Sequence, residues 1–485
     1  MTKLNRILII VIIVLSFYGY NFACTGFSIK NDNRIVACFN FDFQFGAGHI
    51  YINKRNVERR RYLLYAESPI QWISKYGSIT FNIAGVNLPH DGMNEAGLVV
   101  LSMGLDDTKF PNPDNRYAID ENGWIQYQLD NSANIDEVIK NMKNIRISSR
   151  SIGDSHFLIV DSTGNSLIIE YINEEEKIYT GKNLPFPLLA NDTYSNMLTY
   201  LKQQKEFGGL KEDKFRVGSS CSRFTYIAKR LREYNPSSES ELDFAFGILN
   251  DVKQSNTQYQ VIYDIANRSI NYKSHNSNDV KRIRFDEINF DCDMPILMTD
   301  IQSSFIGDIK KDFLEYDPQR CKKELIEFNK KTFEYLPNDV LFEIADSPTR
   351  SKCINNGLKA SDKNNINMSD LTASLKQPKE KNIIIPLNSA DTTLNYEIEL
   401  NRLSKNDNYF MLDVPYNSNL IPGNNVFITP NPVRIEKGSK SAKVKVTLLT
   451  NRIKKGFNGQ LIVKLISEEV KISNENQFTI RIRKE

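Results

Sequence analysis

The sequence contains few of the residues that bind metals. Only four histidines and six cysteines occur among 485 residues, and no two cysteines have CxxC spacing. Structural zinc sites need about four such ligands held close together, so this scarcity argues against a zinc site. Disulfides form in exported proteins, but the positions of these cysteines do not tell which of them pair.

Charge of one sign and long apolar runs are also scarce. The formal net charge is +3, and the one compact basic block is Arg59-Arg60-Arg61. Nucleic-acid binding requires Lys and Arg gathered on one face, so no nucleic-acid partner is expected. No segment approaches the roughly 18 continuous apolar residues of a membrane-spanning helix. We therefore expect no membrane span in the mature protein.

The first 23 residues have the composition of an export signal. Lys3 and Arg6 precede Ile7–Phe17, an apolar run of 11 residues. A helix of that length cannot cross a bilayer core of about 30 Å, whereas a short apolar run after positive charges is typical of a signal peptide. We predict a signal peptide over residues 1–23, cleavage after Ala23, and export to the periplasm or the extracellular space.

Cys24 follows this leader directly, and a lipid anchor is therefore an alternative fate. A cysteine right after a leader is the lipoprotein pattern, but the preceding residues are Asn21-Phe22-Ala23. Lipidation usually requires Leu at the third position upstream, and ordinary signal peptidase prefers a small residue there. Asn21 matches neither preference, so both fates stay open, beside that of an ordinary core cysteine.

Strand-like and helix-like segments predict more than one domain, as expected for a chain of this length. Over residues 24–345, strands lead, helices follow and strands return before a helical extension, as in a layered α+β domain. Residues 346–382 are polar and predict a linker. Short strands at regular intervals over residues 383–485 predict a β-sandwich.

The first strands of the mature chain predict a hairpin that brings a carboxylate to Cys24. The β-rich runs CTGFSI and RIVACFNFD flank Lys30-Asn31-Asp32-Asn33, a cluster of turn formers. A turn centred there makes opposed residue numbers sum to about 64–66, and opposed residues lie roughly 5 Å apart. Asp42 is therefore expected beside Cys24.

Cys24 can become a nucleophile only if a base removes its proton. Among the histidines, His156 lies in an alternating strand and is expected to be structural, while His49, His90 and His275 are expected in loops or on the surface. Cleavage of the leader would instead give Cys24 a free α-amine, with a pKa of about 7.7–8.0. That amine is suited to general-base catalysis near neutral pH.

Six motifs resemble one known family. CTGF, NFD, WISKYGSITF, DGMNEAGL, LLAND and SSCSRF occur in the order found in the choloylglycine hydrolase family, which includes bile salt hydrolases, penicillin V acylases and related linear-amide hydrolases. The resemblance covers about Cys24 to Asp291. It implies an αββα sandwich of the N-terminal nucleophile hydrolase type.

The resemblance also implies roles for single residues. Cys24 matches the nucleophile, Asp42 the carboxylate that orients its amine and thiol, Asn191 the side-chain oxyanion donor, and Arg223 the supporting cation. Gly104 matches the position of a second oxyanion donor, a backbone N–H. Each residue also has a structural reading: Asp42 could end a strand, Asn191 could sit in a turn, and Arg223 could pair with a carboxylate on its own helix.

The activity implied by the resemblance is hydrolysis of a non-peptide linear amide in a small N-acyl substrate, with no metal or organic cofactor. Many bile salt hydrolases have Arg where this chain has Phe39, which argues against a standard bile salt hydrolase. An acyltransferase on the same fold is an alternative, as is a surface lipoprotein whose degenerate hydrolase domain serves as a binding module. Relatives are often tetramers, so a homo-oligomer is compatible with the resemblance.

Overall fold

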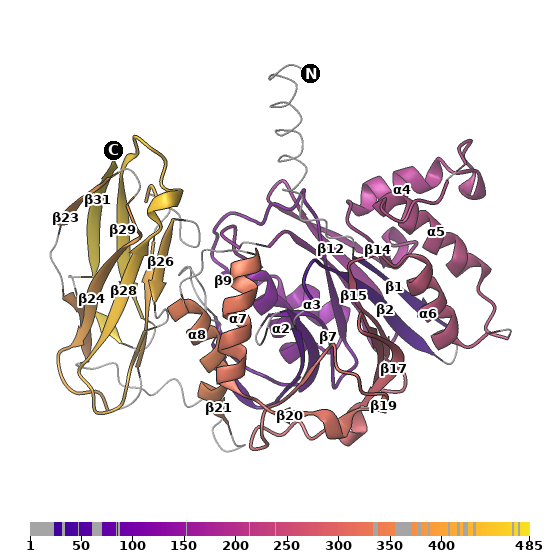
Figure 1. Ribbon diagram of the computed structural model, residues 1–485, viewed down its shortest axis with the longest axis horizontal. Helices are drawn as coiled ribbons and strands as arrows, with labels where there is room; N and C mark the ends of the chain where they lie inside the picture. The colour runs from indigo at the N-terminus through magenta and orange to yellow at the C-terminus, as the bar shows by residue number, and fades with distance from the viewer. Residues whose placement is uncertain are drawn as a thin grey trace, which may run out of the picture.

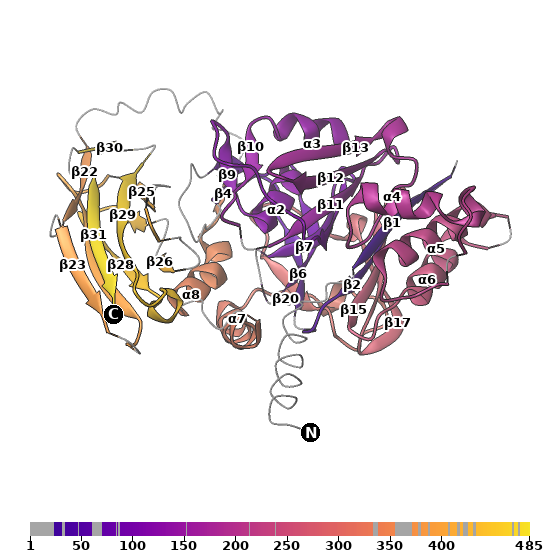
Figure 2. The ribbon, with the colours of Figure 1, turned by 90° about the horizontal axis from the view of Figure 1, so that it is seen from above.

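The computed structural model shows two β-rich regions, with helices α7 and α8 between them (Figures 1 and 2). Over residues 24–354, helices and strands form layers, and residues 372–485 form a separate pair of sheets. The structure describes residues 24–31, 34–46, 48–60, 70–83, 85, 88–151, 153–212, 214–237, 239–332, 338–354, 371–376, 380–386, 389–405, 408–414, 418–420, 425–429, 433–467, 470–473 and 476–485. The predicted signal peptide lies outside the described residues.

Two large sheets make up the first region. The seven-stranded sheet has the order β14 (Leu188–Leu189), β1 (Thr25–Lys30), β2 (Ile35–Asp42), β15 (Thr257–Asp264), β16 (Ser269–Ser274), β17 (Ser277–Arg284) and β19 (Gly307–Asp308). The nine-stranded sheet has the order β13 (Glu175–Thr180), β12 (Ser166–Ile172), β11 (Ser155–Val160), β8 (Val99–Gly104), β7 (Pro89–Asn94), β6 (Ser78–Ile83), β3 (Gly48–Asn53), β18 (Leu297–Asp300) and β20 (Leu314–Glu315).

The predicted hairpin is present at the start of this region. Strands β1 and β2 pair antiparallel with Thr25 opposite Asn40 and Lys30 opposite Ile35, so opposed residue numbers sum to 65. This register confirms the expected approach of Cys24 to the end of β2. Nearly every residue of both strands is buried, because the hairpin lies inside the seven-stranded sheet with β15 on its other side.

Helices cover the outer face of each sheet. Helix α6 (Glu241–Asp251) packs on β2 and β15, and α5 (Ser220–Glu233) contacts β14 and α4 (Tyr194–Lys202). On the other side, α2 (Glu121–Asn131) packs on β7 and β8 and is followed by α3 (Ile135–Asn141). One apolar core lies between the sheets and another beneath α2 and α3. A mixed α+β fold in layers is therefore confirmed for this region.

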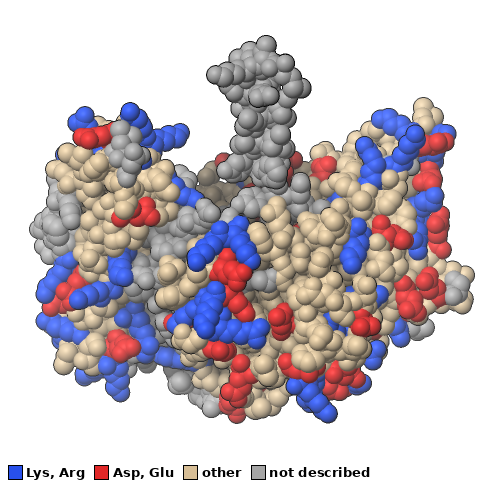
Figure 3. Space-filling view, viewed as in Figure 1, with Lys and Arg blue, Asp and Glu red and all other residues tan. Residues whose placement is uncertain are grey.

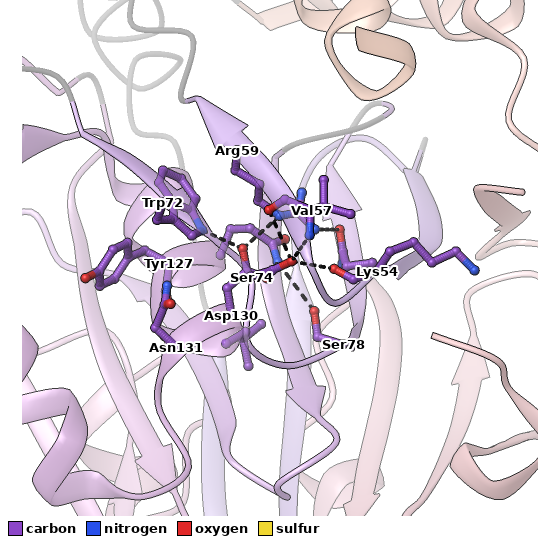
Figure 4. Close-up of polar contacts among 12 residues, drawn as sticks. Lys54, Val57, Arg59, Trp72, Ser74, Ser78, Tyr127, Asp130 and Asn131 are labelled. Carbon is purple, nitrogen blue, oxygen red and sulfur yellow. Dashed lines mark hydrogen bonds and ion pairs between the residues drawn. The ribbon is translucent and has the colours of Figure 1, made fainter. Parts of the chain in front are cut away.

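A small sheet at the edge of the first region is held by a buried carboxylate. Strands β21 (Lys352–Cys353), β4 (Val57–Arg60) and β5 (Gln71–Ile73) form this sheet. Figure 4 shows the side chains of Arg59 and Trp72 converging on Asp130 of α2. The Arg59 Nε lies 2.8 Å from the Asp130 carboxylate, and the Trp72 indole N–H donates to it at 2.7 Å. Trp72, one of the motif residues, is thus part of the scaffold.

The helical extension returns to this small sheet. Helices α7 (Pro318–Thr332) and α8 (Asn338–Asp346) pack on each other and precede β21. A disulfide joins Cys292 to Cys353, across 61 residues of chain. Together with the pairing of β21 and β4, it fastens the end of the extension to the first region.

The C-terminal region consists of two five-stranded sheets around one apolar core. The first has the order β26 (Val426–Thr429), β28 (Ser441–Leu448), β24 (Thr392–Leu400), β22 (Thr372–Lys376) and β30 (Lys471–Ile472). The second has the order β23 (Glu380–Ile385), β31 (Gln477–Lys484), β29 (Asn458–Ile466), β25 (Asn408–Asp413) and β27 (Val433–Ile435). Strand β22 and the start of β23 fall within residues 346–382, the range predicted as linker.

Two whole-molecule features bear on partners. Among the described residues, no helix is both long and apolar enough to cross a membrane. Basic and acidic side chains are interspersed over the face shown in Figure 3, in keeping with the small net charge.

Candidate active site

Cys24 and Asp42 meet where the β1–β2 hairpin opens. Cys24 is fully buried, and its Sγ accepts the backbone N–H of Asp42 at 3.4 Å while lying 3.7 Å from the Asp42 carbonyl oxygen. Burial, and secondarily the charge of Asp42, raise the pKa of the thiol far above its ordinary value, and Arg223 opposes this shift. The thiol is therefore protonated near neutral pH and needs a base before it can attack a carbonyl.

Only one of the two Asp42 carboxyl oxygens has a hydrogen-bond partner among the described residues. Its Oδ1 accepts a hydrogen bond from the Thr257 hydroxyl, and its buried Oδ2 has no hydrogen-bond partner among the described residues. Burial raises the pKa of Asp42 to about 7, against the lowering effects of Thr257 and Arg223. A cationic amine placed beside Oδ2 would give this oxygen a partner and lower that pKa.

Arg223 connects the nucleophile strand to the loop that carries Asn191. Its guanidinium is fully buried and donates to the Thr25 hydroxyl at 2.9 Å, to the Val217 carbonyl at 2.8 Å and to the Asn191 Oδ1 at 3.1 Å. It also lies 3.5 Å from the Cys24 carbonyl oxygen. Burial lowers the pKa of Arg223, while Asp42 and Cys24 raise it. These bonds contradict the alternative in which Arg223 pairs with a carboxylate on its own helix.

Asn191 and Gly104 are in direct contact. Asn191 lies between β14 and α4, and its Nδ2 donates to the Gly104 carbonyl oxygen at 2.9 Å. Because Arg223 donates to Oδ1, the orientation of the amide is fixed, with its NH2 toward Gly104. An amide NH2 has two hydrogens, so one remains for a further acceptor. All five residues singled out from the sequence are therefore gathered in one linked site.

One family model matches part of the chain. Residues 24–221 match the model of linear amide C-N hydrolases, choloylglycine hydrolase family. This part of the chain is similar to that family. Cys24, Asp42, Gly104 and Asn191 lie inside the matched range, and Arg223 lies two residues beyond its end.

Single proteins and solved structures are also similar to parts of the chain. A penicillin V acylase of Pectobacterium atrosepticum is 28% identical over 156 residues, which is 29% of this chain and 41% of the relative. The chain thus spans less than half of that relative's length. The structure of a penicillin V acylase from Agrobacterium tumefaciens has a TM-score of 0.54 at 21% identity and covers 61% of this chain and 98% of its own. A mutant of the conjugated bile acid hydrolase from Clostridium perfringens has a TM-score of 0.47 at 18% identity, over 59% of this chain and 98% of its own.

Two histidines are not where the sequence pattern predicted them. His49 lies buried in β3 with its Nδ1 3.4 Å from Glu324, and His90 lies buried in β7. The prediction of loop or surface positions for these two is therefore wrong: β3 pairs with β6 and the distant β18, and β7 lies between β6 and β8 in the middle of the sheet. His156 is fully buried in β11, as its alternating strand predicted.

Phe39, which replaces the arginine of many bile salt hydrolases, lies in an aromatic cluster. Its ring stacks on the His90 imidazole at 5.8 Å between centroids, and Phe41 meets the same imidazole at 4.5 Å. Burial lowers the pKa of His90 to about 3, so this imidazole is neutral. The Phe39–Phe41–His90 cluster is thus apolar and uncharged, although the buried Asp91 follows His90 directly in β7.

A hollow opens beside the same cluster. Its empty volume is about 230 Å³ when the space open to solvent is counted, and its enclosed part has room for about one water molecule. The described residues that line it carry no charge; they include the rings of Phe41, Phe45 and Tyr259 and the amides of Asn82, Gln258 and Gln302. Phe41 directly precedes Asp42 in β2, at the end of the hairpin where Cys24 lies.

The sequence patterns missed two further groups at the site. Thr257 binds Asp42 from a position 215 residues away, and no local motif marks it. Asp91, buried in β7, accepts hydrogen bonds from the hydroxyls of Tyr259 and Tyr263. The DGMNEAGL motif contains Asp91, so the sequence marked this residue, but no motif contains its partners Tyr259 and Tyr263.

Proposed function

We propose that the first region is an amidohydrolase that cleaves a linear, non-peptide C–N bond of a small N-acyl substrate. The observation that carries this proposal is the linked arrangement of Cys24, Asp42, Arg223 and Asn191, in which the buried Asp42 Oδ2 has no partner among the described residues. An α-ammonium group on Cys24 would supply that partner. The match of residues 24–221 to the linear amide C-N hydrolase model supports the reaction class.

The first half of the reaction forms a thioester. After leader removal, the α-amine of Cys24 takes the thiol proton, and Sγ forms a bond to the amide carbon of the substrate. The carbonyl oxygen becomes an oxyanion that accepts hydrogen bonds from the Asn191 Nδ2 and the Gly104 N–H. The C–N bond then breaks, and the α-ammonium returns its proton to the departing nitrogen.

The second half releases the acid. The α-amine takes a proton from water, the resulting hydroxide oxygen attacks the thioester carbon, and the same two donors hold the second oxyanion. The C–S bond breaks, and the thiolate is protonated by the α-ammonium. Asp42 orients this amine throughout, while Arg223 favours the thiolate and holds Asn191 in place. The steps balance without a metal or an organic cofactor.

The acyl group of the substrate is proposed to be neutral and largely apolar. The hollow beside Phe41 offers aromatic walls and three amide side chains, and no charged residue lines its described part. Neither Phe39 nor the neutral His90 offers a cation that could pair with an anionic acyl chain. A penicillin V acylase-like substrate therefore fits better than a standard bile salt.

Export is part of the same proposal. Residues 1–23 would act as a signal peptide, and their removal would free the α-amine on which the reaction depends. The disulfide between Cys292 and Cys353 supports an oxidising destination. An acyl chain attached to Cys24 would block both the thiol and the amine, so the lipoprotein alternative and catalysis exclude each other.

The test combines mass spectrometry with a nucleophile variant. The intact mass of natively secreted protein is expected to correspond to a chain that begins at an unmodified Cys24. Cys24→Ala, processed at the same bond, should lower hydrolysis of neutral acyl p-nitroanilides by about 10³-fold or more. Full activity of that variant, retention of Ala23, or a diacylglycerol adduct would each refute the proposal. Acylated amine products in the presence of added amines would instead reveal the acyltransferase.

A further inference from the structure

A buried histidine–glutamate pair lies behind the candidate oxyanion donors and has no part in the proposed chemistry. The register of β11 and β12, with Phe157 opposite Ile169, places His156 opposite Glu170. Both side chains are fully buried, and the His156 Nδ1 lies 3.2 Å from the Glu170 Oε1. Burial of ionisable groups costs free energy unless they are paired. Apolar side chains would fill this position at lower cost, so the presence of the pair suggests that it has a role.

Glu170 reaches the loop that carries Asn191. The same Oε1 accepts the backbone N–H of Tyr194 at 2.7 Å. Tyr194 is the first residue of α4, three residues after Asn191, and N–H groups at this position have no partner within the helix. A carboxylate at the start of a helix is also favoured by the helix dipole. Glu170 therefore anchors the start of α4 to the nine-stranded sheet.

His156 belongs to the strand that supports the other donor. Ser155, its neighbour in β11, is the strand partner of Gly104 at the end of β8. Gly104 in turn accepts the Asn191 Nδ2 at 2.9 Å. These contacts link Gly104 through β11, His156 and Glu170 to α4, and from α4 through Asn191 back to Gly104. The His156–Glu170 pair therefore lies between the strand that holds Gly104 and the helix that follows Asn191.

We propose that Glu170, held in place by His156, is a positioning residue for the oxyanion donors Asn191 and Gly104; this inference rests on the proposed hydrolase function. Preorganised donors stabilise an oxyanion only when they lie within a few tenths of an ångström of the required position. Loss of the carboxylate would leave the Tyr194 N–H buried without its acceptor. The start of α4, and Asn191 with it, would then shift.

The first experiment compares two substitutions in the full-length mature protein. Glu170→Ala removes the acceptor of the Tyr194 N–H, whereas Glu170→Gln keeps an oxygen that can accept it. With a neutral acyl p-nitroanilide, the alanine variant should lose about 10- to 100-fold in kcat with KM unchanged, since a misplacement of about 1 Å costs up to about 10²-fold. The glutamine variant should recover most of that loss. Glu175→Ala, in the exposed strand β13, is the matched control and should match wild type.

A second readout separates positioning from general damage. Alkylation of Cys24 by iodoacetamide is displacement at a saturated carbon and develops no oxyanion, so its rate should be the same in wild type and Glu170→Ala. Parallel losses of alkylation and hydrolysis would show that the substitution damages the whole site and would overturn the inference. So would an alanine variant that keeps the wild-type kcat.

A double-mutant cycle makes the test independent of any single variant. In an Asn191→Ala background, the donor that Glu170 reaches through α4 is absent and only the effect on Gly104 remains, so Glu170→Ala should cost clearly less in kcat than it does in the wild-type background. Full additivity of the two losses would overturn the inference. If Glu170→Ala does not fold, His156→Ala and the conservative His156→Asn enter the same cycle with the same criteria. Wild-type protein that hydrolyses no acyl anilide refutes the proposed function itself, whereas an active wild type with an additive cycle refutes only the role of Glu170.

Discussion

Between and beside the large sheets of residues 24–354 lie buried acids, bases and amides, whereas the two C-terminal sheets enclose an almost wholly apolar core. In the first region the fully buried groups include Asp42, Asp91, Glu170 and Arg223. In the described part of residues 372–485, the buried polar residues are Ser404, Asn408 and Thr450, and none of them is ionisable.

This difference indicates which region is adapted for chemistry. Each buried ionisable group costs free energy unless it is hydrogen-bonded or paired, and apolar packing alone would stabilise a fold more simply. In the first region Asp42 and Arg223 contact Cys24 itself, while Glu170 binds the start of α4 and Asp91 binds two tyrosine hydroxyls. The C-terminal sheets follow the alternation of inward apolar and outward polar residues that stability alone requires, as β24 and β31 show.

After loss of the nucleophile itself, the largest effect should come from removing one oxyanion donor from the first region. Asn191→Ala deletes the Nδ2 donor and the Oδ1 that binds Arg223. Loss of one such donor typically lowers kcat by about 10²- to 10³-fold, and steady-state hydrolysis of an acyl p-nitroanilide measures it. Asn183→Ala, at an exposed position of the preceding turn, is the control that should match wild type. A loss below about threefold would mean that Asn191 is only a structural link to Arg223.

A core substitution in the C-terminal sheets should show the opposite pattern. Leu412 in β25 is fully buried, and Leu412→Ala should lower the free energy of unfolding of these sheets by about 2–5 kcal/mol. Its kcat should equal that of wild type. Leu403→Ala removes an exposed side chain and should change stability by less than about 0.5 kcal/mol.

The two tryptophans make this prediction measurable. Trp72 and Trp124 both lie in the first region, so tryptophan fluorescence follows the unfolding of that region, whereas far-ultraviolet circular dichroism follows both. Leu412→Ala should shift a transition seen by circular dichroism and leave the fluorescence midpoint unchanged. Equal shifts of both signals would show that the two regions unfold as one cooperative unit.

Short sequence patterns predicted the features that depend on residues close together in the chain. The turn formers at residues 30–33 fixed the register of β1 and β2 and, through it, the approach of Asp42 to Cys24. The order of the six motifs indicated the family whose model the comparison then matched to residues 24–221. Strands and helices were also recognisable as a layered α+β fold, because their apolar spacing follows from one face of each element being buried.

Contacts between distant segments could not be predicted in the same way. Thr257 and Asp42 are 215 residues apart, and His49 meets Glu324 from the far end of the region. The pairing of Cys292 with Cys353 depends on how the helical extension returns to the sheet edge. Such contacts follow from the packing of complete sheets and helices, and no short pattern carries this information.

The smallest predicted effect uses pH to separate the regions. Asp91 accepts hydrogen bonds from Tyr259 and Tyr263, yet burial raises its pKa from about 3.8 to about 7. Between these values the unfolded chain has released a proton that the folded protein retains. Rising pH therefore favours unfolding across this window, and the stability that the protonated group contributes below about pH 4 is lost by about pH 7. One such group gives a slope of at most about 1.4 kcal/mol per pH unit.

Asp91→Asn should remove this contribution, leaving the slope that comes from other buried acids such as Asp42. Tryptophan-monitored urea unfolding at several pH values between about 4 and 7 measures it. Asp279→Asn, at an exposed position of β17, should leave the slope unchanged. The C-terminal sheets, whose described core contains no buried carboxyl or imidazole group, should show no comparable slope in the circular dichroism signal. An undiminished slope in Asp91→Asn would mean that Asp91 is already ionised in the folded protein, with the two tyrosine hydroxyls sufficient to hold its charge.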